Sequence, residues 1–172
     1  MHYRCIDFKV VHMYSHPMRR SDREITDFDE LVDIMRSSDI CRLAINTDGA
    51  PYIIPLNFGM SVDGDTIELY FHGANEGTKY DLLEKDPYVS FEMDCSHQLY
   101  IDETKGMCTM LYRSVIGEGF VEDVPVFERK LPLRLLLEHY GRGDLPLPDD
   151  MVAVTRVLKL TVKKMTGKSR RL

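Results

Sequence analysis

The chain has 172 residues, of which 44% are hydrophobic and 29% charged, and its formal net charge is −6. This length fits one folded domain with a sizeable core, and the charged fraction excludes general disorder. The acidic balance argues against a protein that coats nucleic acid, and no apolar run is long enough to cross a bilayer.

The charge is distributed unevenly along the chain. Residues 156–172 contain seven cations and no anion, whereas residues 25–155 contain ten cations against 25 anions. The N-terminus lacks the apolar core of a secretory signal, so the protein is expected in the cytoplasm. The four cysteines are far apart and are expected to be free thiols, and Cys95, His97 and Cys108 match no common zinc spacing, so no metal site is predicted.

Residues 1–17 show no clear period and are interpreted as an N-terminal extension, followed by a single domain over residues 18–172. A helix is predicted from Asp27 onward, because Asp27 can cap its N-terminus and Glu30 stands three residues later. An apolar stripe at helical spacing follows, formed by Phe28, Leu31, Ile34 and Met35.

Short segments rich in apolar residues, separated by turn signals such as Asp48-Gly49 and Asp63-Gly64, predict a mainly β (α+β) protein. Two more helices are predicted over 78–85 and 126–140, and Pro132 is expected to break or kink the second. We expect six strands that close into a small barrel with peripheral helices. The predicted strands cover residues 40–47, 51–60, 66–72, 88–93, 107–121 and 152–164.

No P-loop, dinucleotide-binding glycine motif or nucleophile elbow occurs. Three polar segments remain as candidate sites: Pro55–Phe58, Phe71–Lys79 and Tyr112–Ser114. In the second segment a glycine-bounded loop precedes Lys79 in the first turn of a helix, which is an arrangement suited to phosphate. The alternative is a tight loop with a solvated lysine. Arg113 likewise either faces solvent from its strand or binds an anion, with Ser114 beside it.

Several motifs together resemble the 5-nitroimidazole-resistance (Nim-like) proteins, which belong to the pyridoxamine 5'-phosphate oxidase-like FMN-binding split barrels. The resemblance covers about residues 18–168 and lies in the order and spacing of the motifs. These are Met18–Ile25, Pro55–Gly59, Tyr70–Ala74, Lys79, Asp86–Glu92, Tyr112–Gly117 and Thr166–Lys168.

The resemblance implies a split-barrel homodimer that holds FMN at the subunit interface. The acidic body and the lack of a long apolar run separately argue against a nucleic-acid or membrane partner. It implies that Pro55, Leu56, Asn57 and Phe58 lie along the flavin, with His72 and Ala74 near it. Lys79 would contact the phosphate, and Tyr112, Arg113 and Ser114 would form a further flavin-contacting strand. The oxidase branch closes with a tryptophan-containing substrate motif, and this chain has no tryptophan, which argues against pyridoxine-phosphate oxidation.

Two functional hypotheses follow from the resemblance. In the first, the protein is a reductase that passes electrons from NADH or NADPH through FMN to a nitroaromatic, quinone or similar acceptor, and His72 acts near the reacting face. In the second, it binds flavin, haem or a deazaflavin without turnover, as a carrier or sensor. A third interpretation, ranked last, is that the basic C-terminal segment binds nucleic acid or a membrane surface.

Overall fold

The computed structural model describes residues 18–172, and the predicted extension over 1–17 lies outside the described residues. Within residues 18–172 no helix is long and apolar enough to cross a membrane. The elements in chain order are η1 (Ser21–Arg23), β1 (Glu24–Ile25), α1 (Phe28–Arg36), β2 (Cys41–Ile45), β3 (Tyr52–Leu56), β4 (Gly59–Asp63), β5 (Thr66–Gly73), α2 (Thr78–Lys85), β6 (Tyr88–Asp102), β7 (Met107–Asp123), η2 (Val126–Glu128), α3 (Lys130–His139), α4 (Asp149–Val154) and β8 (Arg156–Arg170).

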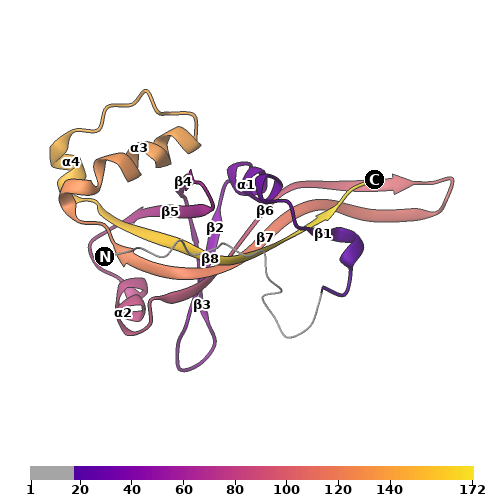
Figure 1. The fold of residues 1–172 in the computed structure, drawn as a ribbon, viewed down its shortest axis with the longest axis horizontal. Coiled ribbons are helices and arrows are strands. Elements are labelled where there is room, and N and C mark those ends of the chain that lie inside the picture. The colour runs from indigo at the N-terminus through magenta and orange to yellow at the C-terminus, as the bar shows by residue number, and fades with distance from the viewer. Residues whose placement is uncertain (1–17) are drawn as a thin grey trace.

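The strands form one antiparallel sheet in the order β3-β2-β6-β7-β8-β5-β4, and β1 pairs with β8 outside this path. The α3 and α4 helices lie together at one end of the molecule, and the β6–β7 hairpin projects at the other end (Figure 1). The mainly β fold with peripheral helices is therefore confirmed. The predicted number of strands is wrong, because the described chain has eight rather than six.

The predicted strand over 51–60 is two strands, because the chain leaves the sheet ladder at Asn57 and Phe58. The Phe58 side chain is fully buried, and its ring lies 4.2 Å from that of His139. The Phe58 amide donates to the Tyr140 hydroxyl at 3.2 Å, as does the Asn57 side-chain amide at 3.1 Å. A side chain from the end of α3 thus replaces the partner strand at this point.

The basic C-terminal segment belongs to the sheet. The strand predicted over 152–164 begins only at Arg156, after the short helix α4, and continues to Arg170. It pairs with β7 along its length and with β5 over its first part, so most of the C-terminal cations occupy strand positions. The two-residue strand β1, which the sequence pattern does not reveal, pairs Glu24 with Lys168.

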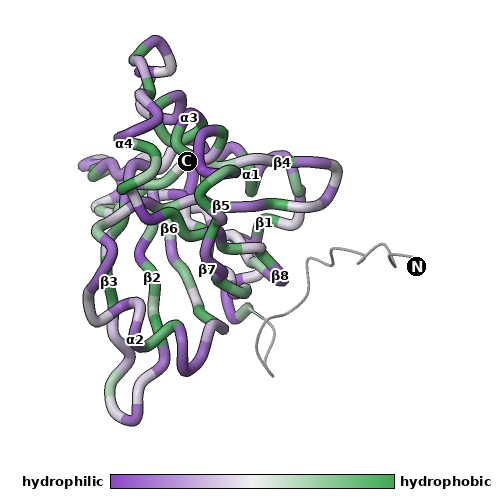
Figure 2. Tube along the Cα trace, turned by 90° about the vertical axis from the view of Figure 1, so that its left-hand side faces the viewer, coloured by the Kyte–Doolittle hydropathy of each residue, from purple (hydrophilic) through white to green (hydrophobic). Residues whose placement is uncertain are grey.

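The core lies between the inner face of the sheet and α1. The predicted cap is present, because the Glu30 amide donates to the Asp27 carboxylate at 2.8 Å. Three residues of the predicted helical stripe, Leu31, Ile34 and Met35, are fully buried, and Phe28 is partly buried. Apolar and polar residues are interleaved along the strands, which gives each strand one core-facing side (Figure 2). The helix prediction over this segment is therefore confirmed.

Pro132 does not break the helix in which it lies. The predicted 126–140 helix is a 3₁₀ turn followed by α3, and Pro132 is the third residue of α3. A proline in the first turn removes no helical hydrogen bond, because the first amides of a helix have no partner within it. The predicted helix is therefore interrupted, as expected, but the interruption lies at Arg129, and α3 itself continues through Pro132.

Gly59 allows α3 to approach the sheet. A Cβ built at Gly59 would lie 2.4 Å from the Leu136 amide nitrogen, which is backbone and cannot turn aside. We expect Gly59→Ala to destabilise the fold by about 2 kcal/mol through overpacking. Gly49→Ala is the matched control, since the nearest atom to its Cβ would be 3.9 Å away. Urea unfolding of both variants measures the difference, and equal stabilities would contradict the proposed contact.

Candidate functional site

Two of the three predicted segments lie together. The pairing of β4 with β5 starts with Gly59 opposite Tyr70. Asn57 lies two residues before Gly59, and His72 lies two residues after Tyr70. Pro55 and Leu56 precede this point on β3, where Pro55 is exposed and Leu56 half-buried. The turn between β3 and β4 therefore places the first predicted segment beside the end of β5, where the second begins.

The second segment forms a small cradle around Gly73. A Cβ built at Gly73 would lie 2.8 Å from the Tyr80 hydroxyl oxygen and 3.1 Å from the Lys79 ammonium nitrogen. The absence of a side chain at Gly73 thus leaves these two polar groups side by side. Ala74 follows in the exposed loop before α2. This brings together the glycine, the loop and the lysine that the sequence singled out.

Lys79 and Tyr80 both have unused polar groups. Within residues 18–172 no carboxylate forms an ion pair with Lys79, whose ammonium nitrogen lies 4.3 Å from the Tyr80 ring centroid. The Tyr80 hydroxyl is buried and has no hydrogen-bond partner among the described residues. A buried hydroxyl without a partner is costly, and a phosphate oxygen would satisfy both groups. The residues present therefore fit an anionic group such as the phosphate of FMN.

Arg156 fixes Tyr80 from the other side of the loop. Its guanidinium lies 3.9 Å from the Tyr80 ring centroid, donates twice to Asp123 at 2.6 Å, and donates to the carbonyl of Asn75 at 3.1 Å. These contacts tie the loop before α2 to the ends of β7 and β8. Arg156 is thereby already paired, whereas Lys79 remains available to a ligand.

His72 is exposed on β5, and its environment holds its pKa below the ordinary value of 6.5. The main cause is desolvation by its surroundings, and the second is the positive charge of Lys79. A lowered pKa keeps the imidazole neutral at pH 7. His72 then offers one nitrogen that donates and one that accepts a hydrogen bond.

The third predicted segment lies elsewhere. Tyr112, Arg113 and Ser114 face Arg170, Ser169 and Lys168 across the β7–β8 pair. The Arg113 guanidinium forms an ion pair with Asp33 of α1 at 2.5 Å, and the hydroxyls of Ser37 and Ser96 lie 3.4 Å from it. Strand alternation places Tyr112 and Ser114 on the face opposite to Arg113. In this structure Arg113 has a carboxylate partner of its own, as an arginine inside an apolar strand requires.

A long distance separates this strand from the cradle. His72 pairs with Val157 of β8, whereas Ser114 pairs with Lys168 of the same strand. Lys168 is eleven residues beyond Val157, which is about 35 Å along a strand that rises ~3.3 Å per residue. The two ends are also apart in Figure 1, with α2 near one end of the molecule and the C-terminus near the other. A single chain cannot bring both segments to one small ligand.

The outer face of the sheet carries uncovered apolar side chains between the two ends. Ile53, Ile116 and Phe120 are 64%, 39% and 48% exposed. The register places them on one face, since Pro55, Arg42, Glu92, Ile116 and Thr166 lie in one row across five strands. This surface carries both apolar and charged side chains, and it joins the strand of Pro55 to that of Ser114.

A model of the pyridoxamine 5'-phosphate oxidase family matches residues 27–169, and the chain belongs to this family. The structure is similar to that of a Bacteroides thetaiotaomicron protein provisionally named a 5-nitroimidazole antibiotic resistance protein. The two share 28% identity with a TM-score of 0.75, over 85% of this chain and 86% of that chain. The predicted resemblance is thus confirmed at the level of the family.

Two further solved structures have the same fold at lower identity. The flavocytochrome Anf3 from Azotobacter vinelandii is 20% identical with a TM-score of 0.74, over 91% of this chain and 73% of that chain. The FAD and haem binding protein from Mycobacterium smegmatis is 19% identical with a TM-score of 0.74, over 87% and 74%. No curated protein sequence matches the chain.

Sequence reasoning missed Tyr80, Tyr140 and Arg156. Tyr80 follows the predicted Lys79 directly, but nothing in the sequence shows that its hydroxyl turns toward Gly73. Tyr140 contacts Asn57 across 83 residues of chain, and no local pattern reports such a contact. In the sequence, Arg156 is distinguished only as the first cation of the basic C-terminal segment.

The coupling between Lys79 and His72 can be measured. Lys79→Met removes a positive charge, so the pKa of His72 should rise toward 6.5 while staying below it, because desolvation, the larger cause, remains. Titration of the imidazole proton resonances by NMR gives both values. Lys85→Met, at the other end of α2, is the control and should leave the His72 pKa unchanged. A His72 pKa that does not respond to Lys79→Met would rule out the coupling.

Proposed function

We propose that the protein is an FMN-dependent reductase that takes electrons from NADH or NADPH and passes them to a nitroaromatic, quinone or similar small acceptor. The observation that carries the proposal is the cradle of Gly73, Lys79 and Tyr80, whose unpaired ammonium and hydroxyl suit a phosphate. Membership of the oxidase family and the likeness to the Bacteroides protein support it. The flavin would supply the redox chemistry, and the protein would position it.

Different residues would bind the phosphate, contact the flavin and act on the reactant. Lys79 and the Tyr80 hydroxyl would hold the FMN phosphate, and the turn at Asn57 and Phe58 would run along the flavin. His72 would lie near the reacting face. Since its pKa is below the ordinary value, the neutral imidazole would orient a reactant by a hydrogen bond or accept a proton. Pro55, Leu56, Ala74, Tyr112 and Ser114 complete the proposed flavin-contacting set. Arg113, whose side chain is on the opposite face and pairs with Asp33, would support this strand from behind.

We propose that the working form is a homodimer in the cytoplasm. The argument is geometric, because the cradle and the Tyr112–Ser114 strand lie about 35 Å apart along β8 and meet only if a second copy supplies one of them. The uncovered outer face with Ile53, Ile116 and Phe120 is a surface that a second copy could cover. The three described cysteines are free thiols, which suits a reducing compartment.

The alternative proposal is a protein that binds flavin, haem or a deazaflavin without turnover. Two proteins of the same fold, one named a flavocytochrome and the other an FAD and haem binding protein, favour it, each with a TM-score of 0.74. The two proposals differ in one observable. A reductase lets a nicotinamide reduce its bound flavin, whereas a carrier holds the flavin without accepting electrons from either nicotinamide.

The first test is the visible spectrum of the purified protein, followed by steady-state oxidation of NADH and NADPH with a nitroimidazole acceptor. We expect flavin bands, and His72→Ala should retain them while turnover falls about tenfold or more. Lys79→Met should lower the affinity for FMN but leave the affinity for riboflavin unchanged, because riboflavin lacks the phosphate. A protein that stays colourless after incubation with FMN would remove the flavin proposal, and unchanged turnover in His72→Ala would reject the catalytic role.

The dimer is tested by placing a charge on the outer face. Ile116→Asp should give a monomer in size-exclusion chromatography with light scattering and should also lose flavin, because a buried unpaired carboxylate is costly. Leu131→Asp is the matched control, since Leu131 is 64% exposed on α3, away from this face, and should remain dimeric. A monomeric wild type, or an Ile116→Asp protein that remains dimeric, would contradict the proposed interface.

A further inference from the structure

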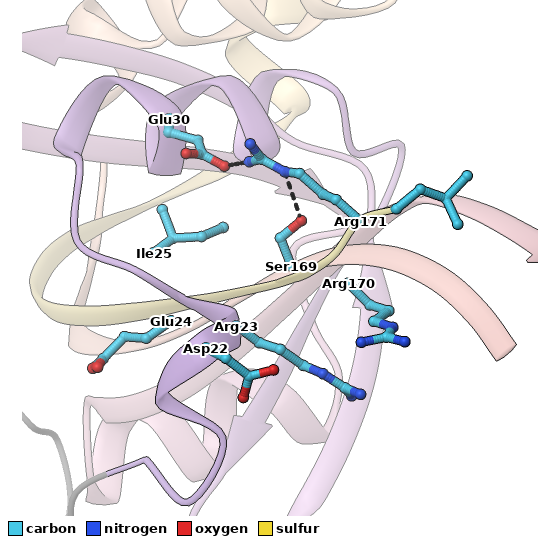
Figure 3. Close-up of a pocket in the computed structure, with 9 residues that line it drawn as sticks. Asp22, Arg23, Glu24, Ile25, Glu30, Ser169, Arg170 and Arg171 are labelled. Carbon is cyan, nitrogen blue, oxygen red and sulfur yellow. Dashed lines mark hydrogen bonds and ion pairs between the residues drawn. The ribbon is translucent and has the colours of Figure 1, made fainter.

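A charged cleft lies at the C-terminal end of β8, far along the strand from the cradle of Gly73. It has a volume of about 330 Å³ and lies between β8 and the segment of η1, β1 and the start of α1. Figure 3 shows the guanidinium ends of Arg23 and Arg170 on the same side of β8, while Arg171 extends to the other side toward Glu30. Two arginines from distant parts of the chain thus point toward the same space.

Arg23 and Arg170 both lack partners. The Nε atom of each is buried without a hydrogen bond, and neither forms an ion pair with any residue in 18–172. The other part-buried arginines of this range all donate to carboxylates or carbonyls, namely Arg20, Arg113, Arg129, Arg134 and Arg156. A part-buried guanidinium without an acceptor is unfavourable, and a second one beside it adds repulsion. A bound anion would therefore stabilise this pair of arginines.

The acidic residues around the cleft are engaged elsewhere. Asp22 accepts two hydrogen bonds from Arg20, at 2.7 and 2.6 Å, and these are the main reason why its pKa is lowered to about 2, with the nearby charge of Arg23 as a smaller cause. Glu30 is bound by Arg171, whose Nε also donates to Ser169. The carboxylate of Glu24 points away from Arg23 and Arg170 in Figure 3. The anion that completes the arginine pair must therefore come from outside these residues.

The cleft adjoins the strand that is expected to contact the flavin. Arg170 is opposite Tyr112 and Lys168 is opposite Ser114 in the β7–β8 pair, so all four side chains share one face. An anion held by Arg23 and Arg170 would thus lie beside Tyr112. It would be about 35 Å along β8 from Lys79 of the same chain.

We propose that Arg23 and Arg170, with Lys168 beside them, form a phosphate-binding subsite for the nicotinamide that delivers electrons to the flavin. This inference rests on the proposed function and deepens it. Two guanidinium forks match the oxygens of a pyrophosphate, and an arginine holds such a group with paired hydrogen bonds. The pyrophosphate of a nicotinamide dinucleotide is joined to its reactive ring through a sugar. Anchoring it beside Tyr112 therefore leaves the ring free to meet the flavin.

The experiment titrates inorganic pyrophosphate into the purified protein and measures binding by calorimetry, with and without added FMN. Arg23→Gln and Arg170→Gln should each weaken pyrophosphate binding about tenfold, because each removes charged hydrogen bonds. The same variants should raise KM for NADH and NADPH about tenfold, leave kcat unchanged and keep the flavin spectrum. Arg36→Gln, at the exposed end of α1, is the control and should change none of these values.

Arg170→Lys separates the effect of charge from that of geometry, since it keeps the positive charge but loses the paired N–H donors of the guanidinium. An intermediate affinity for pyrophosphate is expected. Pyrophosphate binding that is equal in the wild type and both glutamine variants would overturn the site, as would no binding to the wild type. Loss of pyrophosphate binding with unchanged KM would overturn the assignment to the nicotinamide. If Arg23→Gln or Arg170→Gln weakened the binding of FMN but not of riboflavin, the arginine pair would bind the phosphate of the flavin. That result would also overturn the assignment to the nicotinamide.

The arginine pair and the reductase activity are tested by separate measurements. Pyrophosphate binding is measured without FMN as well, so the arginine pair is tested even if the protein holds no flavin. A protein that binds FMN and turns over while ignoring Arg23→Gln and Arg170→Gln would retain the reductase proposal and reject the subsite.

Discussion

The pairing of β7 with β8 is the constraint on which the rest of the structure depends. These two long strands lie side by side from Tyr112 opposite Arg170 to Asp123 opposite Leu158. Every other part of the candidate site is positioned through them. The β5 strand with His72 pairs with the first part of β8, and the cleft with Arg23 lies at its last part. The register of one antiparallel pair therefore decides which functional groups can share a ligand.

An irregularity in this pair changes which residues of β8 face outward. The register shifts between Glu118 and Gly119, whose partners are Lys164 and Val162, so Lys163 is left without a partner. Before this bulge the outward positions of β8 are odd-numbered, as at Lys159, and after it they are even-numbered, as at Lys168 and Arg170. A Cβ at Gly119 would lie 2.2 Å from the Thr161 carbonyl oxygen, so the close approach at the bulge requires a glycine. The bulge thus helps to place the cations of the C-terminal segment on the face of Tyr112 and Ser114.

The sequence predicts local structure such as helix caps and turns. It does not predict which residues from distant parts of the chain come into contact. The capped helix at Asp27, the helix after Gly77 and the turns at glycine all depend on neighbouring residues, and the structure has them. Phe58 is different, because the chain leaves the sheet there to meet Tyr140, which is 82 residues away in sequence. The motifs placed Lys79 and Ser114 in one site. No spacing along a single chain reveals that they are held at opposite ends of β8.

The cations illustrate the same limit in electrostatic terms. From the sequence, the ten cations of residues 25–155 appeared to be the scarce partners for a phosphate, and the seven at the C-terminus a solvated excess. In the structure Arg113 of the first group is neutralised by Asp33, whereas Arg170 of the second is half-buried and has no partner in residues 18–172. What decides the availability of a cation is whether the fold brings a carboxylate to it. Lys79 and Arg170 are among the described cations for which it does not, and each lies beside a segment expected to meet the flavin. A dimer that joined these segments would place both unpaired charges around one ligand site, where the phosphates of two reactants would compensate them.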